Sequence, residues 1–273
     1  SHYQKGFHVT GTVGSFSATA AAGRMLGLSD QQLAVAFGIA ATQAAGLKSN
    51  FGTMCKPLHA GTASEHGLRA ARLAAKGFTA RGDSLECDQG FASSQSDHLN
   101  AEAALGEPPS GWHLRNNLFK YHAACYLTHA PIECAKEIRL KNNFPPERVK
   151  KILLRIDSGA DKVCNIPNPT TGLEAKFSLR QTVAMALTGV DTANLESYHE
   201  AVTQEPRIRG LRDKMAIEFQ PHWSHSLAEM AIQLDDGTTI EVTHDSGIPW
   251  ADLDKQRQAI ETKGIPMSLA ELT

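Results

Sequence analysis

The chain has 273 residues, of which 41% are hydrophobic and 21% charged, and its formal net charge is −2 at pH 7. These values are ordinary for a globular protein of one or two domains. The slightly negative charge argues against nucleic acid or an anionic membrane as the partner, and no apolar run is long enough to span a membrane. The five cysteines are scattered and odd in number. They are typical of thiols in a reducing compartment, so we expect a cytoplasmic protein, or one of the mitochondrial matrix.

The first hundred residues predict an all-helical domain. Residues 13–26 are rich in alanine, glycine and serine, which let helices approach closely. Ser29 and Gln32 have the spacing of a capping box and begin a second helix, which we expect to end near Gly46. A third helix is expected over residues 57–76, because proline is favoured in a first helical turn.

The sequence changes character after this helix. Residues 78–109 are expected to form a surface connector, and the Pro/Gly-rich stretch 106–111 is the best domain boundary in the chain. Beyond it, residues 149–156 alternate and are β-branched, as in a strand, while 227–234 and 238–243 flank an Asp-Asp-Gly turn and predict a β-hairpin. Further helices are expected at about 130–142, 179–187, 195–201 and 206–214. This second part therefore predicts an α+β domain.

Lys56 is expected at or just before the N-cap of the third helix. A cation there faces the positive end of the helix dipole, which is unfavourable unless an anion binds between the lysine and the free N–H groups. The residues alone leave two interpretations open, an anion site or a solvated lysine. His59 follows closely. His8, in Gly-Phe-His-Val-Thr-Gly-Thr, could transfer a proton as a neutral imidazole or bind a carboxylate as a cation, or it could be a capping or core histidine.

Lys120 lies between two aromatic residues. A lysine in that setting can pair with a carboxylate or stabilise the dianion that forms when an α-proton leaves; alternatively it is a strand-edge lysine in water. Four residues nearby could be read as a zinc cluster, although their spacing matches no zinc motif that we can justify. These residues are His113, His122, Cys125 and His129.

Three segments, 6–12, 56–61 and 119–129, come in the same order and with similar gaps in one known family. The chain resembles the MmgE/PrpD family, which includes 2-methylcitrate dehydratase, cis-aconitate decarboxylase and iminodisuccinate epimerase. The likeness extends over nearly the whole chain, including residues 167–178.

The resemblance implies two domains, an all-α helical bundle part in residues 1–108 followed by an α+β lid domain in residues 109–273, with the site between them. It implies a cofactor-free, metal-free lyase or isomerase that acts on a di- or tricarboxylate, with a 2-methylcitrate dehydratase-like activity favoured. His8 is expected to transfer or position a proton, and Lys56 and Lys120 to hold carboxylates or the developing enolate-like charge. The substrate-binding or supporting residues are expected to be His59, Tyr121, His122, Cys125 and His129.

In the family, a helical segment that carries an Asp/Thr/His cluster precedes the motif around His8, and further helices follow the region that ends this chain. The resemblance therefore implies a fragment. We expect such a chain to be a homo-oligomer, for instance a homodimer, or to bind the missing segment. The alternative function is a truncated, catalytically inactive carboxylate-binding or interaction fragment.

Overall fold

The computed structural model describes residues 2–107, 111, 113–248 and 254. The chain divides into two compact units, Ser1–Trp112 and His113–Thr273, which are called here the helical unit and the mixed unit. A helical part followed by a part with a mixed sheet and helices confirms the predicted fold class. Among the described residues, no helix has both the length and the apolar character needed to cross a membrane.

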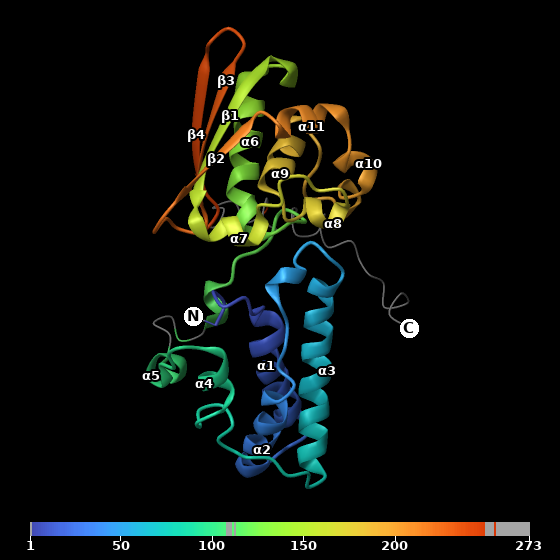
Figure 1. The fold of residues 1–273 in the computed structure, drawn as a ribbon, viewed down its shortest axis with the longest axis vertical. Helices are drawn as coiled ribbons and strands as arrows, with labels where there is room; N and C mark the ends of the chain where they lie inside the picture. Colours follow the sequence, from blue (N-terminus) through green and yellow to red (C-terminus); the bar gives the residue numbers. More distant parts are fainter. Residues whose placement is uncertain (1, 108–110, 112, 249–253, 255–273) are drawn as a thin grey trace. The chain divides into compact units, whose positions relative to one another are not determined.

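The helical unit is built on three helices, and its capping box is present as predicted. The hydroxyl of Ser29 accepts a hydrogen bond from the backbone N–H of Gln32, and the side chain of Gln32 accepts one from the N–H of Ser29. The second helix ends at Ala41, earlier than the expected Gly46. The elements are α1 (Val9–Met25), α2 (Asp30–Ala41), η1 (Lys48–Asn50), α3 (Cys55–Ala75), α4 (Phe91–Gln95) and α5 (Ala101–Leu105), shown in Figure 1.

The predicted position of Lys56 at the helix N-cap is wrong. The N-cap is Met54, so Lys56 is already the second residue of α3. The hydroxyl of Thr53 accepts a hydrogen bond from the N–H of Cys55, and the carbonyl of Thr53 accepts one from the N–H of Lys56, so the first turn closes before the proline. Pro57 lies in this first turn as expected, where its missing N–H costs no helical hydrogen bond.

Close approach of α1 and α3 shapes the helical unit. A Cβ atom at Gly67 would lie 2.4 Å from the Cβ of Ala18 and 2.6 Å from the backbone N of Thr19, so only glycine fits there. A core of small and aliphatic side chains fills the space between α2 and α3. Its buried members are Ala36, Ile39, Ala40, Ala70 and Ala74.

The expected connector at residues 78–109 contains helical turns. It includes α4 and α5, and α4 packs on α1 through Phe91, whose ring meets that of Phe16 at a centroid distance of 4.8 Å. The segment is thus part of the helical unit and not only a linker.

The mixed unit contains a four-stranded sheet in the order β2-β1-β3-β4. Strand β1 runs parallel to β2 and antiparallel to β3, and the predicted hairpin is β3 with β4. Buried residues pair across β1 and β3, with Ile152 opposite Ile232 and Leu154 opposite Met230. The strands are β1 (Val149–Asp157), β2 (Met215–Gln220), β3 (Leu227–Leu234) and β4 (Thr239–Asp245).

Strand β2 was not predicted from the sequence. It is a short edge strand that follows a helix after only two residues. Met215, Ile217 and Phe219 alternate with smaller or polar residues, a strand signal that the expected helix over 206–214 left unused. The expected helix at 195–201 is also not continuous: a 3₁₀ turn (Leu195–Ser197) and a short helix (Glu200–Thr203) occupy that range. Tyr198 between them is buried, which turns the chain inward at that point.

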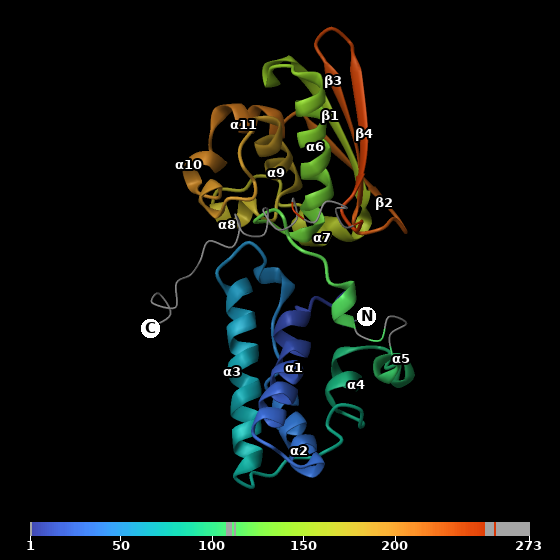
Figure 2. The same cartoon turned by 180° about the vertical axis from the view of Figure 1, so that it is seen from behind.

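Helix α6 is the central helix of the mixed unit. It lies between the sheet and α9 in both opposite views (Figures 1 and 2) and packs against β3, β4 and α9. The helices of this unit are α6 (His129–Asn142), α7 (Asp161–Cys164), α8 (Gly172–Ala175), α9 (Leu179–Leu187), α10 (Glu200–Thr203) and α11 (Pro206–Arg212). The 3₁₀ turns are η2 (His113–Asn116), η3 (Tyr126–Thr128), η4 (Pro146–Arg148), η5 (Ser158–Ala160) and η6 (Leu195–Ser197).

Two glycines of α3 test the helix approach. We expect Gly67→Ala to destabilise the protein by about 1–3 kcal/mol, because the added methyl group overlaps the backbone of α1. Gly61→Ala is the matched control, since a Cβ there meets nothing within 4 Å. It should be neutral or stabilise α3 by up to about 1 kcal/mol. Urea unfolding followed by circular dichroism measures both; equal effects at the two positions would refute the close approach.

Candidate functional site

Two histidines meet in the helical unit. His8 is the residue that precedes α1, and His59 lies in the second turn of α3. Their Nδ1 atoms are 2.9 Å apart, a hydrogen-bond distance, and the side chain of His8 is buried. The backbone N–H of His8 donates to the carbonyl of Gly46, which ties the start of α1 to the loop before α3. The structure thus brings together two of the predicted site residues.

The Nδ1–Nδ1 contact restricts where the protons are. If both rings are neutral, one ring carries its proton on Nδ1 and donates it, and the other carries its proton on Nε2. The pair then has one Nε2 that can accept a proton and one Nε2–H that can donate a proton. Such a pair can take part in proton transfer in either direction.

Lys56 and Phe51 complete this cluster. The ring of Phe51 meets His8 edge-on at a centroid distance of 4.9 Å, and the Nζ of Lys56 is 5.9 Å from the centre of the Phe51 ring. Burial, the charge of Lys56 and the presence of His59 lower the pKa of His8 from 6.5 to about 4. His8 is therefore neutral at pH 7. Of its two predicted roles, proton transfer fits this state and carboxylate binding as a cation does not.

Gly11 makes room for the histidine pair. A Cβ atom at this position would lie 2.3 Å from the carbonyl oxygen of Ala45 and 3.3 Å from the Cβ of His59. A larger residue would therefore push α1 away from the loop and from His59. The glycine belongs to the same short motif as His8, which is the sequence signal for this contact.

Lys120 of the mixed unit lies in a segment without helix or strand. The segment is held by backbone contacts: the N–H of Ala123 donates to the carbonyl of Thr192, and that of Cys125 donates to the carbonyl of Lys176. The exposed side chain of Lys120 folds back, with its Nζ 3.3 Å from the carbonyl oxygen of Ala124. Of the predicted residues, Lys120 is thus held by the contact of its side chain with a backbone carbonyl, and Cys125 by the hydrogen bond of its own N–H.

A cavity of about 120 Å³ in the mixed unit is lined by three of the predicted supporting residues, Tyr121, His122 and His129. Tyr126 and His244 also line it, and the hydroxyl of Tyr126 donates to the carbonyl of Ser246. The ring of His129 packs against those of His122 and Tyr126, each at a centroid distance of 4.9 Å. The cavity is therefore aromatic and polar.

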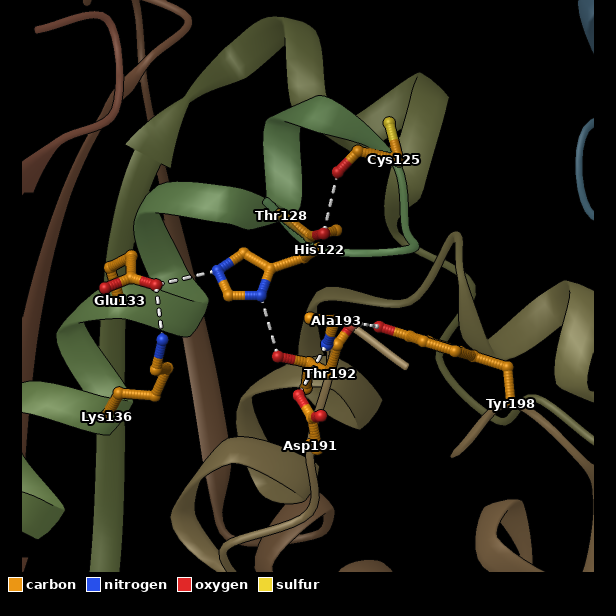
Figure 3. A network of polar contacts seen from close by, with 9 residues as sticks. All are labelled: His122, Cys125, Thr128, Glu133, Lys136, Asp191, Thr192, Ala193 and Tyr198. Atoms are coloured by element: carbon orange, nitrogen blue, oxygen red, sulfur yellow. Dashed lines mark hydrogen bonds and ion pairs between the residues drawn. The ribbon is translucent and has the colours of Figure 1, made fainter. Parts of the chain in front are cut away.

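Both ring nitrogens of His122 have partners, as Figure 3 shows. Its Nε2 is 2.8 Å from Oε1 of Glu133, and its Nδ1 is 2.8 Å from the hydroxyl of Thr192. The Nζ of Lys136 is also 2.8 Å from Oε1 of Glu133. Sequence reasoning missed Glu133 and Thr192. The i,i+3 pairing of Glu133 with Lys136 was visible in the sequence, but their contact with His122 was not.

The zinc interpretation of this region is not supported. A zinc ion could bind His122 only at the expense of its hydrogen bond to Glu133 or to Thr192. In the ranges that the structure covers, no three His, Cys, Asp or Glu side chains come together as a metal-binding group.

Comparison with known proteins gives consistent matches over the chain. Residues 1–103 match the MmgE/PrpD N-terminal domain, and residues 122–263 match the MmgE/PrpD C-terminal domain. The chain is 30% identical to the cis-aconitate decarboxylase of Homo sapiens over 246 residues, which cover 86% of this chain and 50% of that protein. It is 30% identical to the Mus musculus protein of the same name over 254 residues, with 89% and 51% covered. A cis-aconitate decarboxylase of Aspergillus terreus is 23% identical over 261 residues, with 87% and 53% covered. The chain spans about half the length of these relatives.

The low pKa of His8 can be measured. We expect the imidazole of His8 to stay neutral until the pH falls to about 4, and Lys56→Met to raise this pKa toward 6.5, because the variant removes a nearby positive charge. Titration of the His8 ring signals by NMR gives both values. Since the folded pKa is lower than the unfolded one, the contribution of His8 to stability is complete above pH 6.5 and declines as the pH falls to 4. Titration of His8 near pH 6.5 in the unmodified chain would contradict the burial and charge described.

Proposed function

This chain belongs to the MmgE/PrpD family, as its motifs predicted, and from this premise we propose that it supplies the proton-transfer and carboxylate-binding residues of a lyase acting on a di- or tricarboxylate. The similar proteins are cis-aconitate decarboxylases, so decarboxylation of a cis-aconitate-like acid is favoured over the 2-methylcitrate dehydration expected from the motifs. No cofactor is part of the proposal.

The observation that carries the proposal is the contact of the neutral His8 with His59, beside Lys56. Loss of carbon dioxide, of water or of an α-proton from such an acid develops negative charge on a carbon next to a carboxylate. A cation lowers the energy of that charge, and a neutral imidazole can deliver or remove the proton that the carbon gains or loses. The cluster provides both groups in one place.

Each residue then has a stated role. Lys56 binds a substrate carboxylate or the developing charge, and His8 moves the proton while His59 holds its ring through the Nδ1 contact. Lys120 provides a second carboxylate-binding ammonium group, exchanging its contact with the carbonyl of Ala124 for the substrate. Tyr121, by lining the cavity of the mixed unit, supports the segment that carries Lys120.

The alternative from the sequence, carboxylate binding without turnover, predicts the same ligand but no product. An assay for carbon dioxide release from cis-aconitate, with 2-methylcitrate run in parallel for loss of water, separates the two. Binding of either acid without product supports the alternative; product from cis-aconitate supports the decarboxylase. The absence of both binding and product would overturn the proposal.

Substitutions assign the roles. We expect Lys56→Met and Lys120→Met each to raise the Kd for a citrate-like acid by about 10- to 100-fold, the effect of losing a hydrogen bond to a charged group. His8→Gln should leave the Kd nearly unchanged and lower turnover by about 10²- to 10⁴-fold. Isothermal titration calorimetry and the product assay measure these effects.

Lys141→Met is the control for the two lysine variants. Lys141 makes a surface ion pair with Glu137, and its side chain is 71% exposed, so its loss should change neither binding nor fold. Normal affinity in both Lys56→Met and Lys120→Met, or normal turnover in His8→Gln, would remove those residues from the proposed site.

A further inference from the structure

The segment 120–125, called here the lysine segment, carries Lys120 but has no helix or strand to hold it. In such a segment the local conformation depends on side-chain and isolated backbone hydrogen bonds. Besides the backbone contact of Cys125 with Lys176, contacts that hold it meet around one buried side chain, His122, which is only 3% exposed. Figure 3 shows that this ring is bound from two sides, by Glu133 of α6 and by Thr192 of the loop after α9.

We propose that Glu133 is a positioning residue that acts through His122 to fix the lysine segment. The role of Lys120 as a carboxylate-binding group is taken from the proposed function, and Glu133 and His122 contribute to it without touching the substrate. Of the two roles expected from the sequence for His122, substrate binding or support, this inference assigns the supporting one.

The protonation states favour this role. Burial of Glu133 favours a protonated carboxyl, but the hydrogen bonds from His122 and Lys136 and the charges of both groups outweigh it, and they lower its pKa from 4.5 to about 2. An ionised carboxylate can only accept, so Nε2 of His122 must carry a proton and donate it. The orientation of the ring is thereby determined, and neither ring nitrogen faces outward to a ligand.

Thr192, the second partner of His122, is also held in place. The carbonyl of Thr192 accepts hydrogen bonds from the N–H of Ala123, at 2.9 Å, and from the hydroxyl of Tyr198, at 3.0 Å. Thr192 and Tyr198 are both buried. Thr192 therefore holds the lysine segment twice, through its hydroxyl on His122 and through its carbonyl on the neighbouring residue. Removing either partner of His122 should release the segment without affecting the sheet.

Hydrogen exchange tests the positioning without any ligand. Glu133→Leu in the whole chain should increase the exchange rate of the Ala123 and Cys125 amides by roughly tenfold or more, the effect of about 1.4 kcal/mol, while amides of α9 keep their rates. Thr192→Val should have the same effect from the other side. Glu133→Gln keeps an acceptor for His122, so the Ala123 and Cys125 amides should exchange as slowly in this variant as in the unmodified chain.

Glu137→Gln is the matched control, because Glu137 lies one turn further along α6 and forms an ion pair with Lys141 at the surface. It should leave all these rates unchanged. Unaltered exchange at Ala123 and Cys125 in both Glu133→Leu and Thr192→Val would overturn the inference. So would equal acceleration across α6 and α9, since that result indicates a general loss of stability.

Ligand binding gives a second readout. Glu133→Leu should raise the Kd for cis-aconitate, and in combination with Lys120→Met it should add no further loss, because both changes remove the same interaction. When Glu133→Leu is combined with Lys56→Met, the factors by which the two changes raise the Kd should multiply. Full additivity with Lys120→Met would overturn the inference. If Lys120→Met binds normally while Glu133→Leu still loosens the segment, the proposed role of Lys120 fails, but the fixation of the segment by Glu133 is supported.

Discussion

The close approach of α1 and α3 is the constraint on which the helical unit and its site depend. Small residues make it possible: Gly67 faces the backbone at Ala18, and Gly11 faces Ala45 and His59. The same approach brings the residue before α1 and a residue in the second turn of α3 to 2.9 Å. A helix pair with larger residues in contact would be spaced further apart, and the two imidazoles could not share a proton. The alanine- and glycine-rich composition of this unit thus has a chemical consequence.

The mixed unit positions its residues by other means. Its sheet and α6 form a regular framework, but the residues of interest lie in an irregular segment beside it. Hydrogen bonds from side chains far apart in the sequence replace the regular backbone ladder there, since Glu133 and Thr192 reach His122 from opposite sides. Buried polar contacts of this kind are sensitive to the loss of any member, because each leaves an unsatisfied group behind.

Burial has opposite outcomes at two titratable groups. At His8 no anion is among the groups that shift its pKa, so burial and the charge of Lys56 both favour the neutral ring. At Glu133 two donors share one oxygen, and they outweigh burial in favour of the charged form. By linkage, the stability contributed by Glu133 is present above pH 4.5 and is lost as the pH falls to about 2. The two groups therefore act in adjacent pH windows, with that of His8 at higher pH.

The sequence by itself determined the elements that depend on local signals. The capping box at Ser29, the helix over Leu179–Leu187 and the hairpin around the Asp-Asp-Gly turn follow from short-range hydrogen bonding and hydrophobic periodicity, and motif order was sufficient to identify the family. Only the tertiary structure decided which side chains meet. Strand β2 pairs in parallel with β1, which lies far from it in the sequence, and His8 reaches His59 across 51 positions of sequence. The state of His122 depends on Glu133 and Thr192, of which the latter is 70 positions away. Distances and desolvation between remote residues arise from packing, and no local pattern encodes them.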